Sequence, residues 1–242
     1  MTGIDKTRRS AFAWAALEGC SGLGCAEQLT LCRELFEGQT PWEVEVGFGK
    51  GRFLLERARC DPEARFLGIE VAGEYFRLVY RRLFGRKLRN VLLLHGDALV
   101  ALAAVLPSGF ARAVHVYFPD PWPKARHGPR RLIQPTTVDL LLRPLQPGGW
   151  LYFATDFLAY GQEVRQLFSS HPACKVDEIE AWPEGPRTNY EAKYAGEGRK
   201  ILRLAVELLM PANPHPSGLA ELLVAYPEAT FPAATAVERV AS

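Results

Sequence analysis

Apolar segments of strand length alternate with helix-like segments through the middle of this chain, and that alternation limits the possible folds more than any other feature. The predicted strands are 42–48, 65–70, 90–95, 111–118 and 150–155. The predicted helices are 51–59, 73–84, 98–105, 135–143 and 158–169. Apolar strands that alternate with helices are typical of a mostly parallel sheet covered on both faces. The pattern therefore predicts an α/β fold.

The two ends of the chain depart from this pattern. Segments 174–182 and 201–209 both look like strands with no helix signal between them, which predicts one antiparallel strand near the carboxyl terminus. Residues 11–17 are predicted to form a short amphipathic helix, because their apolar run is too short to span a membrane. We expect an amino-terminal extension at 1–40, one domain at 41–210, and a tail at 211–242 in which 219–224 could be helical.

Composition indicates an ordinary globular protein with apolar residues at 48% and charged residues at 23%. Five irregularly spaced cysteines favour reduced thiols in a cytoplasmic protein, and neither a disulfide framework nor a metal site is expected. A net charge of +2 does not by itself indicate a nucleic-acid partner, but the cationic residues cluster at 77–89 and at 124–131. Such clusters suit phosphate contact, although a solvated helix face explains the first equally well.

A glycine-rich turn follows the first predicted strand, in the run Glu45-Val-Gly-Phe-Gly-Lys-Gly51. Gly47, Gly49 and Gly51 permit tight turning and the close approach of a ligand. Their G-x-G-x-G spacing differs from the G-x-G-x-x-G of dinucleotide folds. Glu45 stands just before them, where a carboxylate can hold the ammonium group of an amino-acid-bearing nucleoside.

Acidic residues also stand at the ends of the next strands, and Glu70, Asp97 and Asp120 join Glu45 in this respect. Glu70 can accept both ribose hydroxyls, and Asp97 can meet an adenine amino group. The alternatives are a helix N-cap for Asp97 and a surface charge for Glu70. Because ligands of open α/β sheets bind at this edge, the four acids favour S-adenosylmethionine over a dinucleotide. Their spread along the edge favours no metal.

The segment 117–131 carries the most specific chemistry. Asp120 lies between two prolines and precedes Trp122, and a dense run of cations follows. Proline fixes the backbone and removes hydrogen-bond donors, so both side chains are predicted to sit on a stiff turn. Such a turn suits a reaction centre that faces a planar ring beside a phosphate backbone. The alternative is a proline-rich loop with a solvated charge run.

These motifs, in this order, resemble the bacterial tRNA (guanine-N7-)-methyltransferases over residues 42–209. The resemblance is carried by 45–51, Phe66-Leu-Gly-Ile-Glu70, Gly96-Asp-Ala98, Phe118-Pro-Asp-Pro-Trp-Pro-Lys-Ala-Arg-His127 with Arg130-Arg131, Ala154-Thr-Asp156, and Arg187-Thr-Asn-Tyr-Glu191. It implies a Rossmann-like class I methyltransferase fold, S-adenosylmethionine as cofactor, and tRNA as partner. The implied reaction methylates N7 of the variable-loop guanine, position 46.

The resemblance also implies roles for individual residues. The cofactor contacts are Glu45, Gly47, Gly49, Glu70, Asp97 and Asp120, and Asp120 is also the catalytic-site acid. The substrate contacts are Lys124, Asp156, Thr188, Asn189, Tyr190 and Glu191. The RNA contacts are Arg126, His127, Arg130 and Arg131. Gly128-Pro129 departs from the usual family pattern, so one phosphate contact is expected to be absent. Asn189-Tyr190 also departs from it, and a backbone role of this segment would tolerate that change.

Guanine N7 has an in-plane lone pair and no proton, so its attack on a sulfonium methyl is an in-line displacement that needs no general base. Asp120 is therefore expected to orient and stabilise the base. Trp122 could stack on a displaced base or pack inward. Two other functions remain open. An amino-group methyltransferase would carry an Asp/Asn-Pro-Pro-aromatic turn, which Asp120-Pro121-Trp122 nearly matches. A non-catalytic RNA-binding module would have no need of the four acids.

Overall fold

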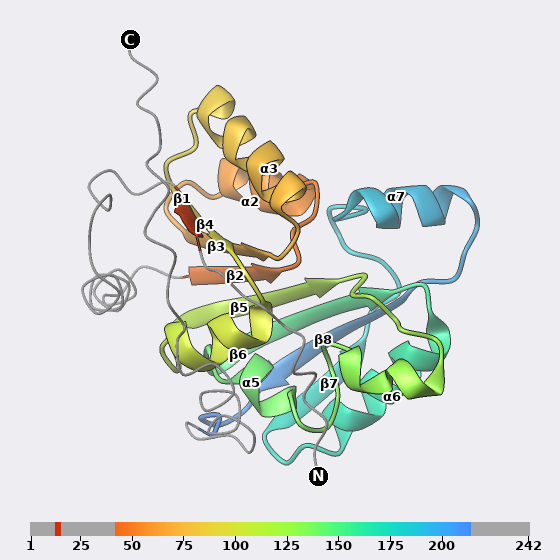
Figure 1. Ribbon diagram of the computed structural model, residues 1–242. Helices are drawn as coiled ribbons and strands as arrows, with labels where there is room; N and C mark the ends of the chain where they lie inside the picture. The colour runs from red at the N-terminus through yellow and green to blue at the C-terminus, as the bar shows by residue number, and fades with distance from the viewer. Residues whose placement is uncertain (1–12, 16–41, 214–242) are drawn as a thin grey trace.

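Figure 1 shows the protein as a computed structural model that describes residues 13–15 and 42–213. Most of the expected amino-terminal extension and of the tail, with the possible helix at 219–224, lies outside the described residues. So do the cysteines at positions 20, 25 and 32. The two described cysteines, Cys60 and Cys174, are free thiols.

The centre of the molecule is an eight-stranded sheet with the order β1-β4-β3-β2-β5-β6-β8-β7. The strands are β1 (Ala13–Ala15), β2 (Trp42–Val46), β3 (Arg65–Glu70), β4 (Val91–His95), β5 (Ala111–Tyr117), β6 (Leu145–Thr155), β7 (Cys174–Glu178) and β8 (Leu202–Leu208). The neighbours from β4 through β6 pair in parallel. The order reverses between β2 and β5, and such a switch point opens a crevice for ligands at the carboxyl ends of the strands.

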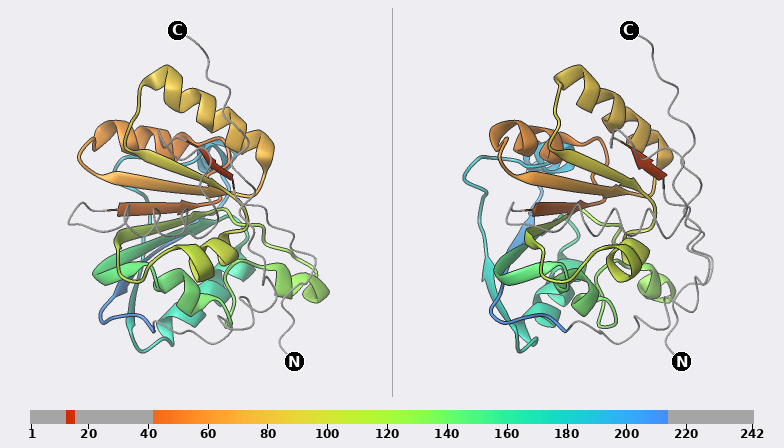
Figure 2. Two further views of the ribbon diagram at one scale, coloured as in Figure 1. Left: turned by 60° about the vertical axis from the view of Figure 1, so that its left-hand side comes forward. Right: turned by 90° about the vertical axis from the view of Figure 1, so that its left-hand side faces the viewer.

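Helices cover both faces of the sheet, as the alternation predicts (Figures 1 and 2). In Figure 1, α2 and α3 lie above the sheet, and α5 and α6 lie below it. The helical segments are α2 (Arg52–Cys60), α3 (Gly73–Arg86), α4 (Ala98–Val100), the π-helical η1 (Ala101–Val105), the 3₁₀ segment η2 (Ala125–Arg130), α5 (Val138–Leu142), α6 (Leu158–Ser169) and α7 (Asn189–Gly196). The predicted α/β class with a mostly parallel sheet is confirmed.

Alternation along β2 shows how the sheet positions its polar residues. Trp42, Val44 and Val46 enter the larger core, which includes residues of α5 and α6. Successive side chains of a strand point to opposite faces, so Glu43 and Glu45 lie on the face covered by α2. Both glutamates are nevertheless only 3% exposed. Two carboxylates are thus buried next to the switch point.

The carboxyl-terminal strands follow the prediction with one addition. β8 pairs antiparallel with both β6 and β7, so it is the antiparallel strand expected near the end of the chain. Between β7 and β8 lies α7, a helix that the sequence analysis does not predict. The strand predicted at 150–155 begins earlier, because β6 also includes the run Pro147-Gly148-Gly149, where the register with β5 shifts. Its glycines permit this irregularity, since Gly148 has a φ of 77°.

The prediction for residues 11–17 is wrong in its element type. Residues 13–15 form β1, which pairs antiparallel with β4 at the edge of the sheet. Residues 13–15 form a strand because β4 would otherwise leave backbone N–H and C=O groups unpaired along this edge. Pairing with them provides hydrogen bonds that stabilise the segment more than a short isolated helix would. No helix of the described chain is both long and apolar enough to cross a membrane.

Gly68 in β3 and Gly85 in α3 should respond oppositely to replacement by alanine. A Cβ at Gly68 would lie 2.6 Å from side-chain carbons of Leu54 and Phe48, whereas Gly85 has open space. We expect Gly68→Ala to lower the free energy of unfolding by about 1–3 kcal/mol through overpacking. Gly85→Ala should raise it by roughly 0.5–1 kcal/mol, because alanine restricts the unfolded chain. Urea denaturation measures both, and an equal effect of the two substitutions would contradict the packing described for β3.

Candidate functional site at the carboxyl edge of the sheet

Five acidic side chains line up at the carboxyl edge of the parallel strands. Following the strand order from β4 to β6, they are Asp97, Glu70, Glu45, Asp120 and Asp156. Glu45 stands next to the end of β2, and the other four lie at the ends of their strands or just beyond. The structure thus brings the acids predicted from the sequence to one edge, on both sides of the switch point.

The glycine turn between β2 and α2 has the geometry that its sequence demands. Gly47, Gly49 and Gly51 have φ values of 74°, 51° and 71°, which side chains rarely tolerate. Gly51 is also crowded, because a Cβ there would lie 2.6 Å from Val79. The amide of Gly49 donates a 2.8 Å hydrogen bond to Glu70, which fixes the turn over the end of β3. Backbone can therefore approach a ligand closely here.

Glu45 is buried, and its Oε2 atom has no hydrogen-bond partner. Burial raises the pKa of this carboxyl to about 8, despite a backbone hydrogen bond from Leu54 that favours the ionised form. The nearby charge of Glu70 raises the pKa further. An acceptor without a partner beside a glycine turn suits a cationic group of a ligand, whose charge would restore the ionised form.

Glu70 and Asp97 are already bonded to backbone. The two oxygens of Glu70 accept 2.8 Å hydrogen bonds from the amides of Gly49 and Ala72. Asp97 Oδ1 accepts from the amide of Leu99 at 2.8 Å, so Asp97 is the N-cap of α4, as one reading of the sequence has it. These bonds fix the orientation of each carboxylate. Each Glu70 oxygen has two lone pairs, so the one bond that it accepts here leaves capacity for a ligand hydroxyl.

The turn that carries Asp120 is strained. Phe118 and Trp122, on either side of it, have φ values of 50° and 42°, which are rare for bulky residues. Each costs on the order of 1–2 kcal/mol, and strain of this kind concentrates at functional sites. The turn is held by the amide of Phe118, which donates to Ala154 at 2.7 Å. Arg131 Nε holds its other side through a 2.8 Å bond to the carbonyl of Pro121.

The cations after this turn differ in their surroundings. Lys124, Arg126 and Arg130 are exposed, as a phosphate contact requires. Arg131 is only 13% exposed in its side chain and forms a salt bridge with Glu163 of α6. Its guanidinium also lies 4.8 Å from the centre of the Tyr160 ring. Arg131 thus anchors the turn to α6, and its contact with RNA stays a prediction.

Trp122 packs against its own loop. The ring has the guanidinium carbon of Arg130 5.1 Å from its centre and the His127 ring edge-on at 5.7 Å. It is half-buried and does not belong to the hydrophobic core. The two sequence-based alternatives for Trp122 both remain compatible with this position, because one part of the ring is covered and another is open.

The segment 188–191 opens α7 through an N-cap. Thr188 Oγ1 accepts from the amide of Glu191 at 3.0 Å. The Glu191 carboxylate is fully buried and accepts from Arg203 Nε at 2.6 Å, from the amide of Arg187 at 2.8 Å and from Trp182 Nε1 at 3.2 Å. The Glu191 side chain is thus an internal anchor of the segment, and its neighbours Asn189 and Tyr190 are exposed. Thr-x-x-Glu is a capping-box pattern and could have revealed α7.

Those exposed neighbours form an aromatic surface beside the Asp120 turn. Tyr190 is 52% exposed, and its ring centre lies 6.3 Å from Phe118 and 6.0 Å from Tyr194. The Arg199 guanidinium lies 4.4 Å from the centre of Tyr194 and makes a 3.1 Å salt bridge to Asp156. Asp156, predicted to contact substrate, thereby links the end of β6 to the segment after α7.

A buried chain of polar groups, which sequence reasoning missed, runs beneath this surface. His115 bonds to Glu43 at 3.2 Å through Nε2 and to the Tyr117 hydroxyl at 2.9 Å through Nδ1. Arg187 donates to the same hydroxyl at 2.7 Å. The tautomer is assigned from these bonds: Tyr117 then donates to Nδ1, and Nε2–H donates to Glu43. Burial lowers the pKa of His115, which agrees with a neutral ring.

Arg187 is enclosed by aromatic rings. Its guanidinium carbon lies 4.0 Å from the centre of Trp182, 4.8 Å from Tyr152 and 5.6 Å from Phe53. Cation–π contacts of a desolvated arginine are worth roughly 2 kcal/mol or more. Arg187 therefore fixes the start of the 188–191 segment over β5 and β6. Polar residues at buried strand positions, such as Glu43 and His115, are the signal that could have revealed this chain.

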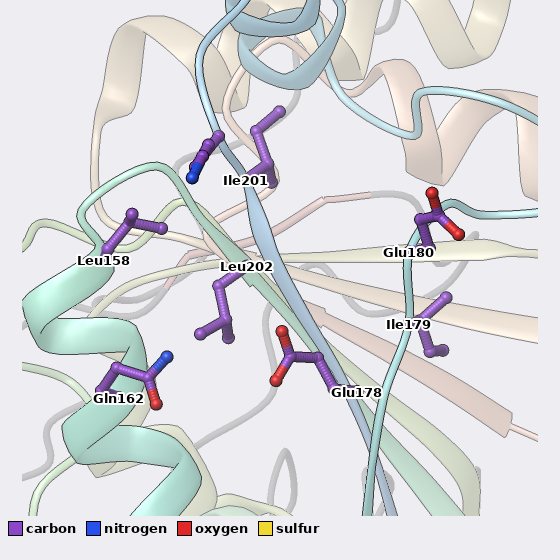
Figure 3. Close-up of a pocket in the computed structure, with 8 residues that line it drawn as sticks. Leu158, Gln162, Glu178, Ile179, Glu180, Ile201 and Leu202 are labelled. Carbon is purple, nitrogen blue, oxygen red and sulfur yellow. The ribbon is translucent and has the colours of Figure 1, made fainter.

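A groove of about 500 Å³ lies farther along the same edge, between α6, β7 and β8 (Figure 3). Leu158 and Ile201 belong to its apolar lining, and Glu178, Glu180 and Lys200 are its charged residues. In the sheet order it follows β6, so it is separate from Glu45 and its neighbours. Two carboxylates against one ammonium disfavour a phosphate group in this groove.

Comparison with known proteins identifies relatives over most of the chain. A family model described as "Putative methyltransferase" matches residues 39–204. The tRNA (guanine-N(7)-)-methyltransferase of Nitrosococcus oceani is 40% identical over 168 residues, which are 69% of this chain and 71% of the relative. The protein of the same name from Chromohalobacter salexigens is 34% identical over 183 residues, 74% of each chain.

Solved structures share the fold at lower identity. The antibiotic-resistance methyltransferase Kmr superposes with a TM-score of 0.52 at 20% identity, covering 81% of this chain and 99% of its own. A 16S rRNA (adenine(1408)-N(1))-methyltransferase from Catenulisporales acidiphilia, in a mutant form with cosubstrate SAM, gives 0.53 at 18% identity, covering 77% and 94%. These likenesses show a class I methyltransferase fold.

Glu45→Gln should flatten the dependence of stability on pH. Burial raises the pKa of Glu45 to about 8 from 4.5, so between these values the folded chain holds a proton that the unfolded chain has released. The wild-type protein therefore loses up to about 1.4 kcal/mol of unfolding free energy per pH unit as the pH rises through this window. Glutamine does not titrate, so the Glu45→Gln protein should not show this loss of unfolding free energy. Urea denaturation from pH 5 to pH 8.5 measures it, with Glu63→Gln at an exposed position as control. Parallel profiles for wild type and Glu45→Gln would contradict the pKa assignment.

Proposed function

The chain belongs to the family of tRNA (guanine-N(7)-)-methyltransferases, and we propose that it methylates N7 of the variable-loop guanine, position 46, of tRNA. The observation that carries the proposal is the buried Glu45 oxygen without a partner beside the glycine turn. A cofactor that is both a nucleoside and a cationic amino acid fits that place. Residues 41–210 would then be the catalytic domain, and the site of action would be the cytoplasm, where tRNA is found.

S-adenosylmethionine fits the acids of the carboxyl edge. Glu45 can accept its ammonium group, and Glu70 can accept the ribose hydroxyls. Asp97 stands where an adenine amino group is expected, and the glycine turn lets the backbone approach the ligand closely. When bound, the cofactor supplies an electrophilic methyl group on a sulfonium. The glycine turn and Glu70 hold its position through their mutual hydrogen bond.

Methyl transfer to guanine N7 mainly requires the protein to align N7 with the methyl group and the sulfur. N7 attacks with a lone pair and carries no proton, so no residue has to remove one. Positive charge moves from sulfur to the purine during the reaction. Asp120, on its strained turn, can accept hydrogen bonds from guanine N1 and N2 and stabilise that charge. Its exposed position beside the aromatic surface of Tyr190 agrees with this role.

The tRNA has to be held and its guanine presented. Moving a base out of its stack costs a few kcal/mol. Stacking on an aromatic side chain such as Tyr190 or Trp122 would return about 1–3 kcal/mol. Lys124, with the exposed cations Arg126 and Arg130, would contact the phosphates in a salt-dependent way. Asp156 and the residues Thr188, Asn189 and Tyr190 would complete the substrate contacts.

The first test is methyl transfer from labelled S-adenosylmethionine to unmodified tRNA transcripts, with nucleoside analysis of the product. We expect 7-methylguanosine, and we expect it to disappear when guanine 46 is replaced by adenine. Label in an exocyclic amino group would identify an amino-group methyltransferase. Failure to bind S-adenosylmethionine would favour an RNA-binding module without catalysis.

Asp120→Asn separates charge stabilisation from proton removal. Asparagine keeps the shape of the side chain and loses its charge, so we expect the rate of methyl transfer to fall by about tenfold to a hundredfold. The pH–rate profile should keep its shape, because no base is needed. Single-turnover rates from pH 5.5 to pH 9 measure both. A basic limb present in the wild type and lost in Asp120→Asn would mean that Asp120 accepts a proton.

A further inference from the structure

Helix α3 carries a concentration of positive charge that the proposed site does not use. Arg77, Arg81, Arg82 and Arg86 lie on the helix and are exposed, and the last acidic residue before them is Glu74. Lys87 and Arg89 follow directly and are also exposed. The sequence alone leaves this run as either a phosphate-binding surface or a solvated helix face.

Contacts within the molecule account for only part of this charge. Arg82 donates to the carbonyl of Lys50 at 2.7 Å, and Arg86 pairs with Glu56 at 2.9 Å. Within 13–15 and 42–213, no acidic partner pairs with Arg77 or Arg81, or with the two cations that follow the helix. Arg77 and Arg81 are four residues apart, so they share one face and repel each other by a few tenths of a kcal/mol. Intramolecular stability does not explain them.

An exposed aromatic ring accompanies these cations. Phe84 is 63% exposed, and its ring centre lies 4.9 Å from that of Tyr80. The apolar face of α3 is already buried, since Phe76, Val79 and Leu83 enter the core beneath the helix. The helix therefore has no broad apolar face for insertion into a lipid bilayer. Arginines beside a single aromatic ring suit RNA better.

The position of α3 relative to the crevice is equally informative. The helix begins at Gly73, three residues after Glu70, and its 14 residues extend roughly 21 Å. Figure 2 shows it running along the side of the sheet formed by β3 and β4. The cations of 124–131 follow β5, on the other side of β2 in the strand order. Two positive surfaces therefore flank the crevice in which the target base must lie.

We propose that the exposed face of α3, centred on Arg77 and Arg81, is a second phosphate-binding surface that holds the tRNA backbone away from the target guanine. The inference rests on the proposed function. Contact on both sides of the crevice fixes the direction of the RNA, whereas contact at 124–131 alone would let it pivot. Phe84 extends the surface at the far end of the helix.

The test is the double variant Arg77→Ala/Arg81→Ala, with binding of an unmodified tRNA transcript measured between 50 and 300 mM salt. We expect the dissociation constant for tRNA to rise about tenfold or more near 0.1 M salt. The slope of its logarithm against the logarithm of salt should fall by about 1 to 2, because two phosphate contacts are lost. Affinity for S-adenosylmethionine and the rate at saturating tRNA should stay unchanged.

The matched control is Arg165→Ala/Lys175→Ala, which removes the same charge from α6 and β7, at the opposite edge of the sheet. Equal weakening by both double variants would overturn the inference, since it would reflect net charge alone. Unchanged tRNA affinity in the α3 variant, with loss of binding to phosphatidylserine vesicles, would assign the surface to a membrane and also overturn it. A wild-type enzyme that methylates another atom, with the same tRNA defect in the α3 variant, would sink the proposed function and leave this surface in place.

Discussion

The buried carboxylate of Glu43 connects three elements of the fold, β2, α2 and β5. It accepts from Arg57 of α2 and Arg112 of β5, each at 2.7 Å, and from His115. Burial opposes its ionisation, but the hydrogen bonds and charges of these partners outweigh burial and hold the pKa of Glu43 at about 2. A buried charge left without any partner typically costs 3–5 kcal/mol, and these three side chains together spare Glu43 that cost. Through His115 the same network reaches Arg187 and the start of α7.

Glu45 stands two residues farther along the same strand, and its pKa moves in the opposite direction, to about 8. Both side chains lie on one face of β2 and are almost equally buried. The difference comes from their neighbours: Glu43 meets three cationic or donor side chains, whereas Glu45 Oε2 meets none and the charge of Glu70 raises the pKa of Glu45 further. Pairs of acids whose pKa values are shifted in opposite directions by their surroundings are typical of functional sites. Glu43 therefore holds three elements of the fold together, whereas Glu45 keeps an oxygen without a partner, which agrees with the ligand contact proposed for it.

The sequence predicted the parallel sheet, the glycine turn and the acids at the strand ends, because each follows from local periodicity or from short-range chemistry. It did not reveal contacts that depend on distant partners. Nothing near Arg131 in the sequence indicates that Glu163 and Tyr160, some thirty residues away, hold its side chain. Glu191 looks exposed in its polar segment, yet Arg203 from β8 draws it into the interior. The strand at 13–15 depends on the open edge of β4.

A methyl transfer without a general base depends mainly on the alignment of the reacting atoms. The Asp120 turn has a tightly defined geometry, which agrees with such a reaction. Phe118 and Trp122 have positive φ values that bulky residues avoid, so the turn persists only because its surroundings determine it. The β6 backbone holds one side, and Arg131 holds the other. Beside this turn, the Glu43 network reaches Arg187 and the start of α7, which carries the aromatic surface. These contacts are all present without a ligand. An in-line displacement at this edge would need such order, since a misplacement of 1 Å can cost about a hundredfold in rate.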